Sequence, residues 1–203
     1  KTGRWVNGVI EEISVPTNWG ALSQATGVSA DGSTIIGYGI SDLGGYQGFS
    51  WRDGTSVGLG DLSDGTANAY ARGVSADGSV IVGGSGSPNG LRAFRWENGE
   101  MQDLGVIDGG TSSYAWDVSD DGAIVVGQGN SGTVFIWDAD NGMRDLRAVL
   151  EDDHGLDLSD WTNLTVYGIS GDGTVIVGRG FRTDGSLEGW RAYIPRDVDT
   201  DGD

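Results

Sequence analysis

Short runs of β-branched and aromatic residues alternate along this chain with Asp-Gly and Asn-Gly pairs. Such pairs tolerate the positive φ angles of a type I′ turn, whose twist suits two antiparallel strands. Phe94 and Trp96 stand two positions apart, which places both side chains on one face of a strand. The pattern predicts β-hairpins over almost the whole chain. Only Leu146–Asp153 has the apolar spacing of a helix, with Leu146, Val149 and Leu150 on one face.

The chain also repeats itself. A strand, a Ser-x-Asp-Gly turn and a β-branched strand are followed by a Phe-x-Trp strand, a second turn and an Asp-Leu strand. Four strands in about 45 residues is the size of one propeller blade. The sequence therefore predicts an all-β fold of tandem four-stranded antiparallel repeats, forming a small β-propeller of about four blades. The turn motif recurs at Val28–Gly37, Val74–Gly83, Val118–Gly127 and Ile169–Gly178.

The last repeat is shorter than the others. Trp190–Pro195 aligns with Leu91–Trp96, so this repeat ends in its third strand. At the other end of the chain, Gly3–Ile13 aligns with Phe94–Leu104 and carries the missing turn and fourth strand. We therefore expect one repeat domain over residues 1–195, followed by an acidic tail at 196–203. Its expected repeats are 14–62, 63–105, 106–146, and 147–195 completed by 1–13.

The split repeat leaves three architectures open. The ends can close a ring within one chain, as propellers commonly do. The sequence can instead be a piece of a longer array. In the third arrangement, the incomplete repeats pair between molecules and give dimers or filaments by strand exchange.

Composition narrows the function classes. The formal charge is −18, and a field of that sign repels nucleic acid and anionic membranes. The chain has no cysteine, which excludes disulfides, thiolate metal sites and cysteine nucleophiles. No apolar run is long enough to span a bilayer. A hydrophobic content of 37% is enough to form a core.

The repeat resembles the bacterial HAF-type extracellular repeat family. The likeness rests on Gly73–Gly83, on Ala93–Gly99 with the Met-Gln-Asp-Leu-Gly that follows, and on Trp161–Gly173 near the end of the array. It covers residues 3–195. The resemblance implies secretion or display on a bacterial surface and no established reaction. The insertion Arg147–Asp160 and the small number of repeats depart from the family's pattern.

The tail suggests a metal site. Asp197, Asp199 and Asp201 stand at alternate positions before Gly202, which is how a calcium-binding loop of the EF-hand type begins. The sequence ends before the acidic residue expected at position 12 of such a loop. Calcium is therefore the one cofactor that the sequence suggests, and the alternative is a solvated acidic tail.

The aspartates of the repeated turns have two interpretations. They can bind cations in a ring, or they can accept hydrogen bonds from their own turns, as aspartate does in such positions. Turn chemistry alone is enough to explain them. They are Asp31, Asp77, Asp121 and Asp172.

Catalytic candidates are few. His154 is the only histidine, and no nucleophile-elbow motif is present. The insertion carries a cluster of acids between Glu151 and Asp160 that would suit a glycosidase if two of them lay close together with one buried. Neighbouring acids on a short exposed segment are more often a solvated face. We therefore expect no enzyme, and a carbohydrate-active enzyme remains an alternative.

Several aromatic residues lie outside the repeated Phe-x-Trp pair, next to the first strand of a repeat. In a ring they would meet on one rim or along the central channel, where aromatic faces beside polar groups suit sugar rings. The other interpretation is packing at the base of each blade. The candidate glycan-binding residues are Trp19, Tyr70, Tyr114, Trp116, Trp161 and Tyr167.

These features predict a secreted or surface-displayed, non-catalytic domain that acts in adhesion, scaffolding or recognition of an extracellular polysaccharide. The expected partners are such a polysaccharide or another surface component, and no nucleic acid. The alternative is an extracellular structural protein that self-assembles into homo-oligomers or filaments through its split repeats.

Overall fold

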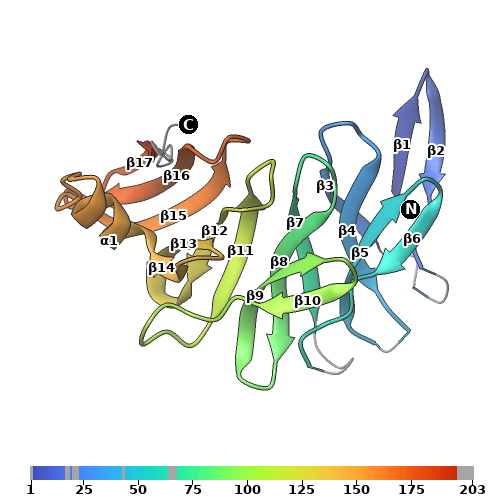
Figure 1. Ribbon diagram of the computed structural model, residues 1–203, viewed down its shortest axis with the longest axis horizontal. Coiled ribbons are helices and arrows are strands. Elements are labelled where there is room, and N and C mark those ends of the chain that lie inside the picture. Colours follow the sequence, from blue (N-terminus) through green and yellow to red (C-terminus); the bar gives the residue numbers. More distant parts are fainter. Residues whose placement is uncertain (1, 17–18, 20–22, 43, 64–67, 196–203) are drawn as a thin grey trace, which may run out of the picture.

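A computed structural model describes residues 2–16, 19, 23–42, 44–63 and 68–195 of the chain. The described residues form five antiparallel sheets and almost no helix. Figure 1 shows these sheets side by side along the long axis, from the N-terminal hairpin to the C-terminal sheet. The predicted fold class is confirmed: the protein is all-β, with the four-stranded repeats of a small β-propeller.

Three sheets have the complete set of four strands, in chain order. The first holds β3 (Ser23–Val28), β4 (Thr34–Ile40), β5 (Tyr46–Arg52) and β6 (Thr55–Gly58). The second holds β7 (Ala69–Val74), β8 (Val80–Ser87), β9 (Gly90–Glu97) and β10 (Glu100–Asp103). The third holds β11 (Ser113–Val118), β12 (Val125–Gly129), β13 (Val134–Asp138) and β14 (Gly142–Asp145), with the 3-10 turn η1 (Asn130–Gly132) between β12 and β13.

The two ends of the array differ from this pattern. At the N-terminus, β1 (Thr2–Val6) and β2 (Val9–Ile13) form a hairpin of their own. At the C-terminus, β15 (Trp161–Ile169), β16 (Val175–Arg182) and β17 (Leu187–Tyr193) form a three-stranded sheet. Before that sheet, α1 (Leu146–Ala148) runs into the π-helical turn η2 (Val149–Asp153). The one predicted helix is therefore present, and Leu146, Val149 and Leu150 are buried, as expected.

The two predicted kinds of turn differ in geometry. Asn98 and Gly99 both have positive φ angles, 53° and 88°, as a type I′ turn requires. In the repeated Ser-x-Asp-Gly turns only the glycine is left-handed, with a φ of 73° at Gly78. There the Gly78 N–H donates to the Ser75 carbonyl, and the Ser75 N–H donates to the Val80 carbonyl. The type I′ prediction was therefore wrong for these turns, because the aspartate side chain bonds the turn from within.

Consecutive sheets pack face to face through apolar side chains. Ile36 of β4 lies in a buried cluster with Ala71, Ile81 and Phe94 of the next sheet. The corresponding β8 residue, Val82, packs in the same way against the sheet that follows it. Each inner sheet therefore has one face toward the preceding sheet and one toward the next.

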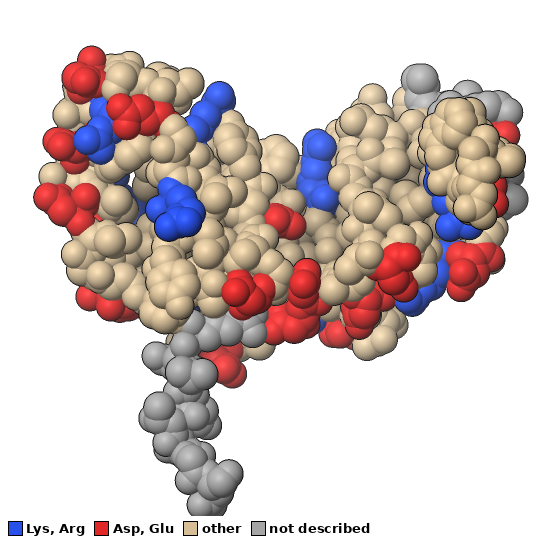
Figure 2. Space-filling view, turned by 90° about the horizontal axis from the view of Figure 1, so that it is seen from above, with Lys and Arg blue, Asp and Glu red and all other residues tan. Residues whose placement is uncertain are grey.

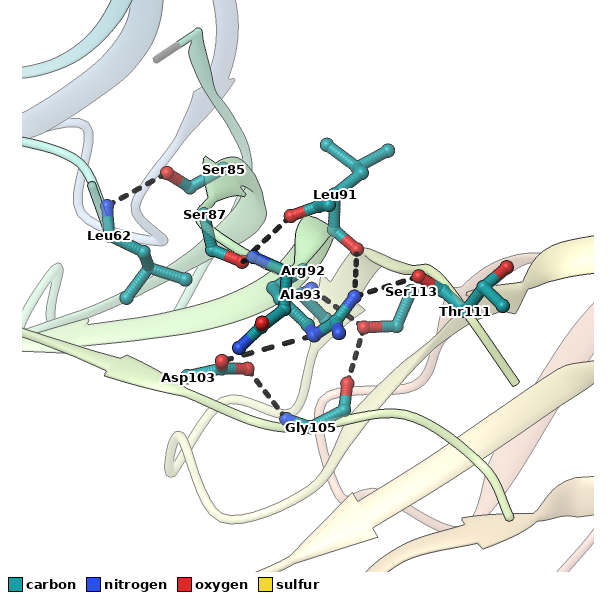
Figure 3. Close-up of polar contacts among 12 residues, drawn as sticks. Leu62, Ser85, Ser87, Leu91, Arg92, Ala93, Asp103, Gly105, Thr111 and Ser113 are labelled. Carbon is teal, nitrogen blue, oxygen red and sulfur yellow. Dashed lines mark hydrogen bonds and ion pairs between the residues drawn. The ribbon is translucent and has the colours of Figure 1, made fainter. Parts of the chain in front are cut away.

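Hydrogen bonds also join consecutive sheets, as Figure 3 shows. The Leu62 N–H donates to Ser85 Oγ over 3.1 Å. The Ala93 N–H donates to Ser113 Oγ over 2.8 Å, and that hydroxyl donates to the Gly105 carbonyl. The buried hydroxyls of Ser85 and Ser113 therefore satisfy backbone groups that would otherwise be unpaired between sheets.

A line of backbone hydrogen bonds runs across the Asp-Gly turns. The Ala30 N–H donates to the Ala76 carbonyl, the Ala76 N–H to the Asp120 carbonyl, and the Asp120 N–H to the Gly171 carbonyl. The three distances are 3.0, 3.0 and 2.9 Å. We call this line the turn ladder. It fixes each sheet to the next at equivalent positions.

The last repeat follows a different register from the one that sequence alignment predicts. Trp190 pairs with Gly178 in the position where Phe94 pairs with Gly83. Trp190, and not Tyr193, therefore replaces the buried phenylalanine of the repeat. The alignment of Trp190 with Leu91 was wrong. It relied on the Arg-Ala pair that follows both residues, whereas the strand pairing places the large ring of Trp190 opposite a glycine.

The N-terminal hairpin lies at the opposite end of the array from β15–β17 (Figure 1). Within the described residues, β1 pairs only with β2, and β17 pairs only with β16. The completion of repeat 147–195 by residues 1–13 therefore stays a prediction. No helix in the described ranges is long and apolar enough to cross a membrane.

Candidate functional site

Three tyrosines from the first two complete sheets meet in one cluster. Tyr38 lies on β4, Tyr46 on β5 and Tyr70 on β7. Their ring centroids are 5.8 Å apart for Tyr38 and Tyr46, 5.0 Å for Tyr38 and Tyr70, and 5.4 Å for Tyr46 and Tyr70. These separations fall in the range of favourable aromatic pairs. The cluster therefore presents a continuous, semi-rigid aromatic surface across two sheets.

Arg72 extends this cluster to the third sheet. Its guanidinium lies 5.4 Å from the Tyr38 ring centroid, 5.8 Å from that of Tyr114 and 5.5 Å from that of Trp116. Arg72 Nε also donates to the Tyr114 hydroxyl over 2.8 Å. Cation–π contacts of this kind hold the cation and the rings in place. We call the resulting set of Tyr38, Tyr46, Tyr70, Arg72, Tyr114 and Trp116 the aromatic row.

Polar side chains fix both ends of the aromatic row. The Tyr38 hydroxyl donates to Gln24 Oε1 over 2.7 Å. At the other end, Trp116 Nε1 donates to Gln128 Oε1 over 3.2 Å. The two glutamine amides are thereby oriented beside aromatic faces, an arrangement that suits a ligand with both apolar and hydroxyl surfaces.

The surface is hollowed along the aromatic row. A groove of about 420 Å³ is lined by Tyr70, Arg72, Leu91, Tyr114, Trp116 and Gln128, together with backbone and serine atoms around residue 112. A smaller hollow of about 250 Å³ lies at Ser23, Gln24, Tyr38 and Tyr46. Their sizes and linings suit small, partly apolar ligands or the residues of a polymer.

Burial affects the phenols of this groove. Desolvation raises the pKa of Tyr114, although the bond from Arg72 opposes the rise. Desolvation and the neighbouring tyrosines also raise the pKa of Tyr70. Both hydroxyls therefore stay protonated across the physiological pH range and can donate hydrogen bonds.

The structure brings together three of the six predicted aromatic residues. Tyr70, Tyr114 and Trp116 belong to the aromatic row. Trp19 packs edge-on against Phe49, with the ring centroids 6.1 Å apart. The remaining two, Trp161 and Tyr167, lie on β15, where the guanidinium of Arg182 lies 4.7 Å from the Trp161 ring and that of Arg179 lies 5.6 Å from the Tyr167 ring.

Sequence reasoning missed Tyr38, Tyr46 and Arg72. A signal for this site was available in the residue that follows the repeated glycine: Tyr38, Gly84, Gln128 and Arg179 occupy that position in the four repeats. A Cβ atom at Gly84 would lie 2.2 Å from the Tyr114 ring. Gly84 therefore makes the space that Tyr114 occupies.

The turn aspartates accept hydrogen bonds within their own turns, as turn chemistry predicts. Asp77 Oδ1 accepts from Ser75 Oγ, from the Ser79 N–H and from Ser79 Oγ over 2.7 to 2.9 Å. These bonds lower the pKa of Asp77 to about 2. Asp31 Oδ1 accepts from Ser29 Oγ and from the Ser33 N–H, and its pKa also falls to about 2.

The acids of the insertion are spread over separate contacts. Glu151 lies 3.3 Å from Arg147, Asp153 lies 3.9 Å from Arg144, and Asp157 accepts from the Ser159 N–H. In the part of the chain that the structure describes, no three His, Asp or Glu side chains are grouped so that they could hold a metal ion. The calcium-loop aspartates Asp197, Asp199 and Asp201 lie outside the described residues.

Acidic side chains are unevenly distributed over the face seen in Figure 2. The molecule is hollowed between its two ends, and Asp and Glu gather along the opposite edge and at the left-hand end of the view. The aromatic row itself contains a cation and no carboxylate. It therefore forms a locally neutral to basic surface on a strongly acidic protein.

Solved structures share this fold. A protein assigned as TolB from Agrobacterium tumefaciens is 12% identical with a TM-score of 0.60, over 92% of this chain and 79% of that one. TolB from Acinetobacter baumannii is 16% identical with a TM-score of 0.52, and the match covers 94% of this chain and 46% of that one. A puromycin-hydrolyzing peptidase from Mycobacterium tuberculosis is 15% identical with a TM-score of 0.52, and the match covers 94% of this chain and 31% of that one.

The chain thus spans less than half the length of the latter two proteins. No protein-family model matches the sequence, and no curated protein matches it. At these identities the likeness defines the class of fold alone, a β-propeller built from four-stranded antiparallel sheets.

Proposed function

We propose that this protein is a non-catalytic recognition domain that binds a neutral extracellular polysaccharide along the aromatic row. The observation that carries the proposal is the groove at Tyr70, Arg72, Tyr114 and Trp116, with Gln128 oriented by the indole of Trp116. Aromatic faces stack on the apolar face of a sugar ring, and amides and phenols bond its hydroxyls. The formal charge of −18 favours a neutral polymer over an anionic one.

The proposed location is outside the cytoplasm, on the surface of a bacterium or secreted from it. The resemblance of the repeat to the HAF-type extracellular family supports this location. The non-catalytic assignment is supported by the ion pairs and hydrogen bonds that separate the acids of the insertion. The rival function, a carbohydrate-active enzyme, predicts that amide substitutions of Glu151, Asp153 and Asp160 abolish hydrolysis of a polysaccharide that the wild type degrades.

Affinity electrophoresis tests the proposal. The wild type is run through gels that contain hydroxyethylcellulose, xylan or, as the anionic comparison, alginate. We expect retardation in at least one neutral gel and none in alginate. Trp116→Ala should weaken binding by about five- to 150-fold, since stacking of one ring contributes about 1–3 kcal/mol where it has been measured for nucleic acid bases.

The control is Val57→Ala, because Val57 is 50% exposed on β6 and lies outside the aromatic row. Retention of wild-type retardation by Trp116→Ala and by Tyr70→Ala would contradict the proposed site. Equal losses in Trp116→Ala and Val57→Ala would also contradict it.

A further inference from the structure

One position of the repeat is buried in three sheets and exposed in the fourth. Ile36, Val82 and Val126 occupy this position in β4, β8 and β12, and each is 0% exposed because the next sheet covers it. Val177 occupies it in β16 and is 42% exposed. The sheet β15–β17 therefore carries the apolar face of an inner sheet, and no further sheet among the described residues packs against that face.

The neighbours of Val177 on this face are also exposed. Val175 and Phe181 lie an even number of positions from Val177 on β16, so their side chains share its face. Residues paired directly across two antiparallel strands also share a face, and Phe181 pairs with Leu187 and Val175 with Tyr193. Phe181 is 43% exposed, Leu187 50% and Tyr193 59%. We call Val177, Phe181, Leu187 and Tyr193 the terminal face. Large apolar patches of this kind on soluble proteins mark interaction sites.

The other end of the array has a second uncovered face. Trp5 and Ile10 are paired across the N-terminal hairpin and are 72% and 60% exposed. Their side chains point away from the first complete sheet, since Arg4, on the other side of β1, lies 4.6 Å from the Trp51 ring. We call Trp5 and Ile10 the leading face.

The two faces are complementary in charge. Arg191 pairs with Val177 on the terminal face and is exposed. Glu12 pairs with Gly3, next to Trp5 and Ile10 on the leading face, and is also exposed. Opposite charges at the margin of an apolar contact favour one orientation of the partner.

We propose that a second copy of this chain docks its leading face on the terminal face, head to tail, and continues the repeat array across two molecules. The two faces lie at opposite ends of one molecule (Figure 1), so a chain in this arrangement cannot join them to each other. The proposed contact covers two apolar faces that the described residues leave exposed, with Arg191 and Glu12 at its margin. A heterologous contact of this kind gives rings or filaments. The inference is independent of the proposed glycan site, which lies on the inner sheets.

Light scattering over a range of concentrations tests the contact. We expect the wild type to form species whose mass rises with concentration. Val177→Asp and Trp5→Asp should each remain at the monomer mass of 21.1 kDa. An equimolar mixture of these two variants should form a complex of twice that mass and no larger, because each variant keeps one intact face.

Controls separate docking from misfolding. Val57→Asp changes a valine that is 50% exposed on β6, outside both faces, and should assemble as the wild type does. Tyr193→Asp gives a second variant of the terminal face if Val177→Asp fails to fold, and circular dichroism confirms the fold of each.

Three results would overturn the proposal. The first is a wild type that stays at the monomer mass at every concentration, as expected if only further sequence of a longer chain covers these faces. The second is wild-type assembly by Trp5→Asp, which would mean that two terminal faces meet. The third is a mixture of the two variants that remains monomeric.

Discussion

The sheet β11–β14 and the sheet β15–β17 contain nearly the same turn and β-branched strand, yet they differ in what covers them. Val126 is fully buried between sheets, and Val177, at the equivalent position, is 42% exposed. Both sheets pack one face on the preceding sheet, through Phe135 in one and Trp190 in the other. The repeat therefore encodes two apolar faces per sheet, and the second face is buried only when another sheet follows.

The largest expected effect comes from placing a charge at the two equivalent positions. Val126→Asp would bury an unpaired carboxylate between sheets, and we expect a loss of about 4 kcal/mol in the free energy of unfolding. Val177→Asp leaves the carboxylate in water and should change that free energy by no more than about 0.5 kcal/mol. Denaturant unfolding of the two variants at a concentration where the protein is monomeric measures the difference. Equal losses would mean that the terminal face is covered within the chain.

Glycine substitutions give a smaller contrast. A Cβ atom at Gly83 would lie 1.9 Å from the Tyr70 carbonyl oxygen, so Gly83→Ala forces β7 and β8 apart. We expect this change to cost about 2 kcal/mol. At Gly189, on the terminal side of β17, the nearest atom would be 3.7 Å away. Gly189→Ala should be neutral or slightly stabilising, because it restricts the unfolded chain. Thermal unfolding compares the two, and a loss at Gly189 as large as that at Gly83 would contradict the packing described for β17.

The smallest expected effect on stability comes from substituting the turn aspartates. Their substitutions should cost the same in an inner sheet and in the last sheet. Asp77 and Asp172 accept the same set of bonds from a serine and a residue two positions later. Asp77→Asn and Asp172→Asn should each lower the Tm by roughly 2–4 °C at neutral pH. A much larger shift in one of the two variants would show that its turn depends on the neighbouring sheet.

The pH dependence of this effect has a definite sign. The pKa of Asp77 in the folded state is about 2, below the ordinary value of 3.8. Its ionised form therefore stabilises the fold above about pH 4, and the contribution is lost as the pH falls toward 2. The difference in Tm between the wild type and Asp77→Asn should shrink over that interval.

Strand order, turn positions and the buried helical turn could be predicted from the sequence because they depend on local patterns. Asn98-Gly99 defines its hairpin, and Leu146, Val149 and Leu150 define one apolar face, whatever surrounds them. The repeated turn also shows which position of each strand is apolar. Local pattern was therefore sufficient for the fold class.

The aromatic row could be predicted only in part, because it joins residues of three sheets. Tyr70 and Tyr114 share a position in their repeats, whereas Tyr38 and Tyr46 come from the second and third strands of another repeat. Arg72 joins them through contacts that depend on how sheets stack. The register of β17 was missed for a similar reason, since Trp190 is large enough to replace phenylalanine and no neighbouring residue marks the substitution.

The turn ladder connects the sheets through main-chain atoms alone, and Ala30, Ala76, Asp120 and Gly171 occupy equivalent positions in it. Mutations that change these side chains leave the connecting groups in place. A duplicated or deleted repeat would likewise present a donor to one neighbour and an acceptor to the other. The number of repeats can therefore change during evolution by whole units without redesign of the joints.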